Sequence, residues 1–436
     1  MRPQPMGGPE GDGWVGLWAG LGRHGSFLRH AASSRPHHLA KRATGGSLVA
    51  ALASCLRVAI LAAVNDAFPI SPPRAWAEIN LAALKHNLEV ARAASGGALM
   101  AVVKAGAYGH GLEEVTQVLA ASEVAFFGVA NAGEARRIQQ AGVTTRLYLL
   151  GATWAGEREE IVAREWTPCL STLAEAEHFN RLAQAAGKRL KVHLAVDTGM
   201  GRGGFLPDYL LESMPELERL AHLEIEGIGS HLPSADEDEE FTRGQIECYR
   251  QIVERLGGAA RFKWRHLLNS AGLLAYERDG CNLARPGLML YGVSPLPGFQ
   301  QQLATVMTLK ARVTLVRTLP AGHGVSYGRQ FVTTRTTRVA TIGIGYGDGY
   351  PRSVSGQGAE VAVNGRRCPI LGRVTMDQLM VDVTAAGEVN EGDAVEMFGA
   401  QIPVAEIAAK AGTIIWEIFT GITPRVVRCY THGLPG

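Results

Sequence analysis

Residues 101–151 read AVVKAGAYGHGLEEVTQVLAASEVAFFGVANAGEARRIQQAGVTTRLYLLG, and short apolar runs recur in this stretch. The runs are AVVKA (101–105), AFFGVA (125–130) and RLYLLG (146–151). The segments between them, LEEVTQVLAAS and AGEARRIQQAG, space their apolar residues as helices do. Runs as apolar as these are typical of parallel strands that are buried on both faces. The stretch therefore predicts parallel strands connected by helices.

The same alternation continues as far as residue 292. Five further runs are predicted strands: TPCLST (167–172), KVHLAV (191–196), LEIEGIG (223–229), FKWRHLLN (262–269) and LMLYG (288–292). Together with the first three they give eight candidate strands between residues 101 and 292. That number favours a closed (β/α)8 barrel of the TIM type over an open sheet.

After about residue 300 the pattern changes. Strand-like runs are separated by Gly, Asn and Pro turns, and the first amphipathic helix is IPVAEIAAKAG (402–412). This part of the chain is expected to form a second, mostly β domain. We therefore predict an N-terminal extension over 1–72, a (β/α)8 barrel over 73–305 and a mostly β domain over 306–436.

Composition restricts the class of protein. The chain has 436 residues, 46% hydrophobic and 19% charged, with a net charge of +2. These values exclude collagen-like, coiled-coil and wholly disordered proteins and give no indication of nucleic-acid binding. The six cysteines are scattered, without a CxxC pair or a Cys/His cluster at zinc spacing. We expect a reduced, cytoplasmic protein without a metal, in which the acidic run 236–240 is a solvated loop.

The N-terminal extension differs in charge from the rest of the chain. Residues 1–72 hold seven basic and three acidic residues, and the first 45 show no hydrophobic period, so we expect disorder there. The apolar stretch 47–64 is interrupted by Arg57 and suits neither a membrane helix nor a secretory signal well. A non-native or non-functional extension is favoured, without membrane association. An atypical export or transit signal, implying a periplasmic location, and a membrane anchor stay open.

Polar residues follow five of the eight predicted strands. They are Lys104, Asp197 to Arg202, Ser230 with His231, Asn269 with Ser270, and Arg285 to Gly287. In a barrel such residues converge at the mouth formed by the C-terminal strand ends. A lysine within an apolar run is costly to bury as an ammonium group, and with a lowered pKa it can form a Schiff base.

Each of these residues also has an ordinary structural interpretation. Lys104 could extend to water, Arg285 could pair with a structural carboxylate, His231 could be a core histidine, and the Asn269–Ser270 pair could cap a helix. Gathered at one mouth, they favour a phosphate-bearing cofactor instead. The C-terminal part adds three polar, glycine-rich islands: GHGVSYG (322–328), GIGYGDGYPR (343–352) and GRVTMDQ (372–378). None of them matches a dinucleotide fingerprint, a P-loop or a zinc-protease motif.

These segments, in this order, resemble alanine racemases. The resemblance covers roughly residues 73–430, and AVVKAGAYGHG departs from the family signature only in Gly106, where Asn is usual. It implies an isomerase dependent on pyridoxal 5'-phosphate that interconverts L- and D-alanine for peptidoglycan. It also implies a homodimer whose active sites are shared between subunits.

The resemblance implies a role for each matching residue. Lys104 would bind the cofactor covalently and act as one base, and Tyr327 of the partner subunit would be the second base. The expected phosphate ligands are Tyr108, Ser270, Gly287 and Leu288. Arg285 would face the pyridine nitrogen and His231 would lie against the ring. Arg202 and the partner subunit's Met376 would contact the substrate carboxylate and the phenolic oxygen of the cofactor.

Elementary chemistry agrees with these roles. The α-hydrogen is very weakly acidic, so the carbanion must be delocalised into a cofactor, and inversion needs one base on each face. An arginine at the pyridine nitrogen cannot accept a proton and limits that delocalisation, which as a hypothesis suppresses transamination.

Two positions depart from the family pattern. Ala195 stands where many members have a lysine that becomes carbamylated beside the arginine corresponding to Arg202, and Asp197 is one candidate to replace it. Pro424 stands where some members have a tyrosine near the phosphate. A broad-specificity, serine or lysine racemase therefore stays open as an alternative. A decarboxylase on the same plan and a non-catalytic cofactor carrier agree less well with Tyr327 and MDQ.

Overall fold

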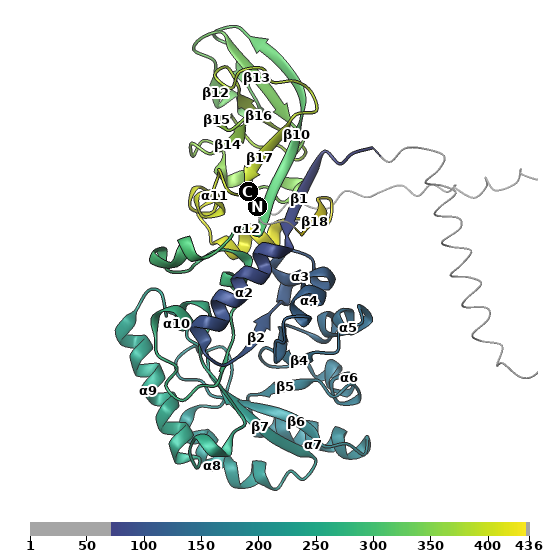
Figure 1. Cartoon of the computed structure of the whole chain (residues 1–436), viewed down its shortest axis with the longest axis vertical. Helices are drawn as coiled ribbons and strands as arrows, with labels where there is room; N and C mark the ends of the chain where they lie inside the picture. The colour runs from purple at the N-terminus through teal and green to yellow at the C-terminus, as the bar shows by residue number, and fades with distance from the viewer. Residues whose placement is uncertain (1–70, 433–436) are drawn as a thin grey trace, which may run out of the picture. The chain divides into compact units, whose positions relative to one another are not determined.

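The apolar runs of the N-terminal half form an eight-stranded parallel sheet in the computed structural model, which describes residues 71–432 (Figure 1). The strand order is β8-β7-β6-β5-β4-β3-β2-β9. The strands are β2 (Ala98–Val102), β3 (Phe126–Val129), β4 (Arg146–Leu149), β5 (Thr167–Leu170), β6 (Leu190–Ala195), β7 (Leu223–Gly229), β8 (Trp264–His266) and β9 (Leu283–Ala284). Their side chains are almost all buried, as expected for parallel strands covered on both faces.

Backbone hydrogen bonds link the two ends of this sheet. The Asn282 amide donates to the Arg265 carbonyl over 3.0 Å, and the Arg285 amide donates to the Leu268 carbonyl over 2.9 Å. The predicted (β/α)8 barrel is therefore confirmed.

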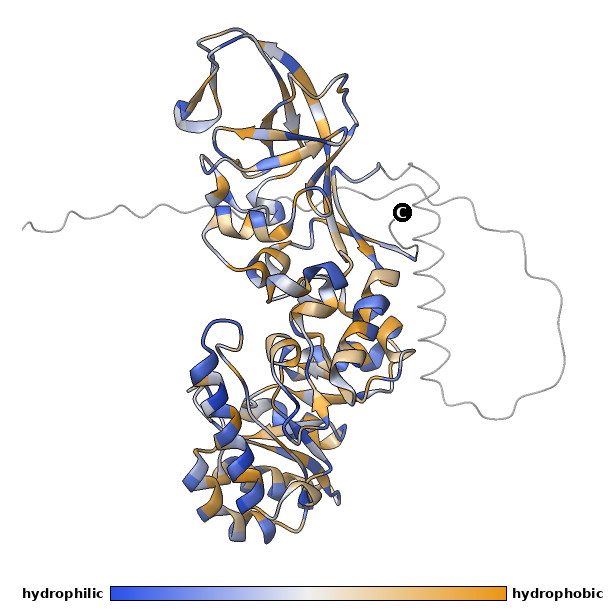
Figure 2. Ribbon diagram, turned by 60° about the vertical axis from the view of Figure 1, so that its left-hand side comes forward, coloured by the Kyte–Doolittle hydropathy of each residue, from blue (hydrophilic) through white to orange (hydrophobic). Residues whose placement is uncertain are grey.

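Helices lie outside the strands, and Figure 2 shows hydrophobic residues alternating with hydrophilic ones along them. They are α2 (Leu81–Ser95), α4 (Leu112–Ala120), α5 (Ala132–Gln140), α6 (Arg158–Ala163), α7 (Leu173–Ala185), α8 (Pro207–Glu218), α9 (Glu239–Arg255) and α10 (Ser270–Ala275). Side chains of Asn131, Thr172 and Asp238 accept backbone N–H groups at the starts of α5, α7 and α9. The acidic run 236–240 thus contributes a cap and the first turn of α9, so the prediction of a purely solvated loop was wrong.

The eighth strand is not where the sequence predicted it. LMLYG forms the 3-10 helix η3 (Leu288–Tyr291), and the short β9 precedes it. The Leu290 amide donates to the Gly287 carbonyl over 2.9 Å, and Gly292 ends the turn at φ 85°. All four residues of η3 are buried, and a short apolar run that is buried on every side gives no periodicity to distinguish helix from strand.

The C-terminal part forms an antiparallel sheet that takes in one strand from the start of the chain. The order is β13-β16-β15-β14-β17-β10-β1-β18, and β10 also pairs with β13, so six strands close into a ring. They are β10 (Met307–Leu319), β13 (Thr337–Ile342), β14 (Glu360–Val363), β15 (Arg366–Leu371), β16 (Leu379–Asp382) and β17 (Ala394–Phe398). β1 (Ala75–Asn80) pairs with β10 and with β18 (Val427–Thr431). The mostly β architecture is confirmed.

Three smaller features complete the C-terminal part. Helix α11 (Val404–Ala411) lies where the sequence predicted a helix, and α12 (Ile415–Gly421) follows it. The hairpin β11 (Gly324–Val325) and β12 (Phe331–Val332) has Tyr327 in its turn.

Several predictions concern residues that the structure does not describe or boundaries that it does not test. The extension 1–72 lies outside the described residues except for its last two positions, and the boundary between 305 and 306 stays a prediction. No helix between residues 71 and 432 is long and apolar enough to cross a membrane. The five cysteines in this range are free thiols.

Replacing Gly292 by Ala is expected to destabilise the protein, because its φ is 85° and an added Cβ would lie 2.2 Å from the Ala304 carbonyl oxygen. We expect a loss of about 2–4 kcal/mol of unfolding free energy, measured by urea denaturation. Gly298→Ala is the control, since nothing lies within 4 Å of an added Cβ there. Equal denaturation midpoints for the two variants would contradict the strained turn at Gly292.

Candidate active site

Lys104 follows β2 directly and begins a turn of unusual handedness, labelled α3 (Lys104–Tyr108). Ala105, Gly106, Ala107 and Tyr108 all have φ between 54° and 64°, the left-handed region. A non-glycine residue there costs about 1–2 kcal/mol, so the surrounding contacts must hold this turn. Gly106 has nothing within 4 Å of an added Cβ, so the backbone and the space both accommodate its departure from the family's Asn.

Two side chains hold the turn. The carboxylate of Glu134, in the first turn of α5, accepts the Ala105 amide over 2.6 Å and the Ala130 amide over 2.8 Å. The ring of His110 is fully buried, and its Nδ1 donates to the carbonyls of Ala107 and Tyr108 over 3.1 and 2.8 Å. Sequence reasoning missed Glu134, because a glutamate in the first turn of a helix is an ordinary feature.

The amine of Lys104 is half-buried and has no hydrogen bond or ion pair with any residue in the described range. Burial lowers its pKa, and the positive charges of Arg202 and Arg285 lower it further, while Glu134 acts in the opposite direction. A larger neutral fraction makes this amine more nucleophilic than an ordinary surface lysine. The alternative of a rim lysine that simply extends to water does not fit this surrounding.

Arg285 follows β9 and is 6% exposed. Its Nη1 donates to Nδ1 of His266 (2.6 Å) and to the His266 carbonyl (2.8 Å). Its Nη2 donates to the Ser230 carbonyl (2.5 Å) and to Nδ1 of His231 (3.3 Å). No carboxylate in residues 71–432 pairs with Arg285, so a structural ion pair is excluded within that range. Its Nε has no hydrogen-bond partner there either, and it is not sealed from solvent.

His231 lies beside this arginine at the mouth. Burial, together with the charge of Arg285, lowers the pKa of His231 to about 3, so the ring is neutral. Because Arg285 can only donate, Nδ1 of His231 accepts and Nε2 carries the hydrogen. The imidazole therefore presents a neutral face to the mouth.

Four of the expected phosphate ligands meet at one place. Ser270 Oγ accepts the Gly287 amide over 3.0 Å, and an added Cβ on Gly287 would lie 2.5 Å from the Tyr108 hydroxyl. Leu288 follows at the start of η3. Burial raises the pKa of Tyr108 to about 12, so its hydroxyl keeps its hydrogen and can donate to an anion. Asn269 does cap α10, accepting the Gly272 amide, yet Ser270 faces Gly287.

Asp197 does not orient Arg202. Its carboxylate accepts the amides of Gly199, Met200 and Gly201 within its own loop, at 2.9 to 3.1 Å. Arg202 is exposed and has no hydrogen bond or ion pair with residues 71–432. The proposed replacement for the missing lysine at position 195 is therefore wrong, because the loop geometry already uses both oxygens of Asp197.

Tyr327 and Met376 belong to the antiparallel part and lie on exposed turns. Tyr327 is 70% exposed at the tip of the β11–β12 hairpin, and Met376 is 53% exposed. Neither side chain has a role within its own subunit's core, so both are free to contact another molecule.

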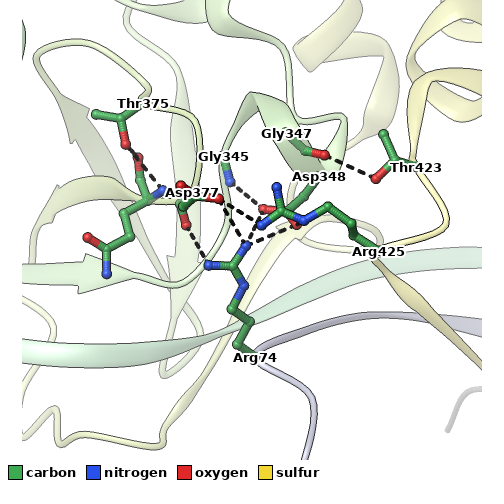
Figure 3. A network of polar contacts seen from close by, with 9 residues as sticks. Arg74, Gly345, Gly347, Asp348, Thr375, Asp377, Thr423 and Arg425 are labelled. Carbon is green, nitrogen blue, oxygen red and sulfur yellow. Dashed lines mark hydrogen bonds and ion pairs between the residues drawn. The ribbon is translucent and has the colours of Figure 1, made fainter. Parts of the chain in front are cut away.

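A network of ion pairs fixes the loop that carries Met376 (Figure 3). Arg74 and Arg425 each contact both Asp348 and Asp377, at 2.7 to 3.5 Å. The Gly347 amide donates to the Met376 carbonyl over 2.8 Å. Pro424 precedes Arg425, so the departure at 424 lies next to this network.

Among the described residues, no group of three or more His, Cys, Asp or Glu side chains is arranged as metal ligands. The chemistry of the mouth instead consists of one reactive amine, an arginine-rich wall and donors for an anion. This arrangement suits a small anionic aldehyde cofactor and an amino acid.

Comparisons with known proteins agree over nearly all of the described chain. Residues 79–295 match the model of the alanine racemase N-terminal domain, and residues 306–430 match that of the C-terminal domain. The alanine racemase of Halothermothrix orenii is 37% identical over 371 residues, which is 83% of this chain and 98% of that protein. The enzyme of Carboxydothermus hydrogenoformans is 40% identical over 365 residues, 81% of this chain and 99% of that protein.

Solved structures give the same result. The alanine racemase of a D-cycloserine-producing Streptomyces lavendulae superposes with a TM-score of 0.78 at 34% identity, covering 84% of this chain and 98% of that one. The alanine racemase of Bartonella henselae, solved with covalently bound pyridoxal phosphate, gives 0.76 at 29% identity, covering 83% and 100%. With both domain models and relatives of this similarity matched, the chain belongs to the alanine racemase family.

Proposed function

We propose that this protein racemises L-alanine and D-alanine with pyridoxal 5'-phosphate, using Lys104 and the partner subunit's Tyr327 as the two bases. The observation that carries the proposal is the placement of Lys104. Its half-buried amine stands without a partner at the barrel mouth, and burial and two arginines lower its pKa. The product D-alanine would serve peptidoglycan synthesis.

The residues of the mouth fit the cofactor. The Tyr108 hydroxyl, Ser270 and the backbone at Gly287 and Leu288 form a place for a phosphate, which a Cβ on Gly287 would obstruct. The unpartnered Nε–H of Arg285 is available to a ring nitrogen, and neutral His231 lies beside it. Lys104 would bind the aldehyde carbon. When bound, pyridoxal phosphate withdraws electrons from the substrate α-carbon and so acidifies its hydrogen.

The two bases have different tasks. Lys104, kept largely neutral, accepts or returns the α-proton on one face of the substrate. The Tyr327 phenol carries out the reverse transfer on the other face. Because Tyr327 is exposed at a hairpin tip of its own subunit, we propose that it acts in the site of a second copy, which makes the enzyme a homodimer.

Arg202 is proposed to bind the substrate carboxylate, with Met376 of the partner subunit beside it. Arg202 lies near enough to lower the pKa of Lys104 and has no partner among residues 71–432, so its guanidinium can bind a carboxylate. Ala195 leaves this arginine without the usual neighbouring anion. That observation favours one second candidate, a racemase of broader specificity that also accepts serine or lysine.

Replacing Lys104 by Ala is expected to abolish racemisation, because both covalent binding and one base are lost. Tyr327→Phe is expected to lower turnover by roughly 10²–10⁴-fold. The visible absorbance of the bound cofactor should persist in Tyr327→Phe, because Lys104 is intact. D-Alanine formation is measured with a coupled D-amino-acid oxidase. Unchanged turnover in either variant would remove that residue from the mechanism.

Subunit exchange tests the shared site. When the two inactive variants Lys104→Ala and Tyr327→Phe are mixed and allowed to exchange subunits, each hybrid dimer contains one intact site. We expect about a quarter of wild-type activity to return. If each subunit held its own complete site, no activity would return.

Glu134→Gln tests the clamp on the turn that carries Lys104. Losing its negative charge removes the influence that raises the pKa of Lys104, so that pKa should fall further. The acid limb of the pH profile for cofactor binding should then move to lower pH, while turnover falls because the Ala105 and Ala130 amides are held less well. Glu113→Gln is the control, since Glu113 pairs with Arg137 and not with the turn. An acid limb that stays in place in Glu134→Gln would contradict this role.

A panel of L-amino acids separates the two substrate proposals. Alanine should be racemised with the highest kcat/KM. Comparable values for serine or lysine would instead support the broad-specificity candidate.

A further inference from the structure

A line of buried polar side chains crosses the interior of the barrel. It begins at Arg285 in the mouth, whose Nη1 lies 2.6 Å from Nδ1 of His266 at the end of β8. Nε2 of His266 lies 2.9 Å from Nδ1 of His193 in β6. Nε2 of His193 lies 4.0 Å from a carboxylate oxygen of Glu226 in β7. All four side chains are buried.

Arg285 fixes the direction of every hydrogen bond in this line. Because a guanidinium can only donate, Nδ1 of His266 must accept, and the hydrogen of that neutral ring is on Nε2. His266 therefore donates to Nδ1 of His193, which places the hydrogen of His193 on Nε2. That atom is buried without a hydrogen-bond partner and has the Glu226 carboxylate as its neighbour. Each donor thus points from the arginine toward the carboxylate.

The backbone of β7 makes room for this line. Its pairing with β6 shifts between Val192 and His193, which leaves Glu226 as an extra residue, and a bulge of this kind redirects a side chain. An added Cβ on Gly227 would lie 2.8 Å from the ring of His193, and one on Gly229 would lie 2.1 Å from the ring of His266. Both imidazoles therefore depend on glycine in the neighbouring strand.

The charges of the line are opposite at its two ends. Burial opposes ionisation of Glu226, but the hydrogen bonds and charge of Arg146 lower the pKa of Glu226 to about 2. Burial lowers the pKa of His193 to about 3 and that of His266 well below its usual range, so both rings are neutral. Lys263 also approaches Glu226, at 3.4 Å, from an exposed position.

We propose that Glu226 is a positioning residue for Arg285, acting through the neutral rings of His193 and His266. Its negative charge polarises both rings and makes Nδ1 of His266 a better acceptor for Arg285. The guanidinium is thereby held by its two terminal nitrogens, and its Nε–H is left for the cofactor. This last step rests on the proposed function, whereas the direction of the hydrogen bonds does not.

The direction of the line can be measured without any variant. Neutron diffraction, or NMR of protein labelled with 15N-histidine, locates the ring hydrogens of cofactor-free and cofactor-loaded protein. We expect a hydrogen on Nε2 and none on Nδ1 in both His193 and His266. A hydrogen on Nδ1 of either ring would overturn the proposal, whether or not the protein racemises alanine.

Variants of the far end test the effect on Arg285. Glu226→Gln removes the charge at similar volume, and we expect turnover to fall about 10-fold with a shifted absorption maximum of the bound cofactor. Glu226→Asp keeps the charge and should restore part of the turnover and the original maximum. Lys263→Met is the control, because it contacts Glu226 from the exposed side and lies outside the line.

The outcomes separate the two proposals. Wild-type turnover and absorbance in Glu226→Gln would overturn the positioning role, even with the expected ring hydrogens. A Glu226→Asp variant no better than Glu226→Gln would overturn it as well, because shape rather than charge would then matter. Failure of wild-type protein to bind pyridoxal phosphate would refute the proposed function and leave the hydrogen positions as the test of the line.

Discussion

Arg285 carries a positive charge into the interior of the barrel, and the described residues bring no carboxylate into contact with it. Burying a lone charge is very costly, so its surroundings must offset that cost. Backbone carbonyls and His266 accept its hydrogen bonds, and the nearest anion on that side is Glu226 at the far end of two histidines. The same charge lowers the pKa values of His231 and Lys104, which keeps His231 neutral and enlarges the neutral fraction of Lys104. One buried cation thus sets the protonation states of the mouth.

The second organising feature is the left-handed turn that follows Lys104. A regular helix starting at this residue would carry Tyr108 along a different path from the one that brings its hydroxyl beside Gly287. Glu134 and His110 hold the turn through backbone groups, so the reactive amine and a phosphate donor share one rigid segment. Strain is accepted here because it places two functional groups within five residues.

Much of this arrangement could be predicted from the sequence. The apolar runs predict the parallel strands because burial on both faces leaves a continuous hydrophobic signal. The eighth strand was misplaced because LMLYG is buried on every side, and the pairing of β1 with β10 leaves no trace in a run that alternates as any strand does. Motif order predicted the residues of the mouth. It did not predict the partners that act through them, since Glu134 resembles a cap and Glu226 resembles an interruption of a strand.

The central claim is that Lys104 is the amine that reacts with the cofactor. Protein loaded with pyridoxal phosphate at neutral pH can be treated with sodium borohydride, which makes the bond between an amine and the aldehyde carbon permanent, and then mapped by peptide mass spectrometry. The account predicts the added group on Lys104 alone, in close to one copy per chain. A group on a different lysine, or none on Lys104 in protein that racemises alanine, would contradict it.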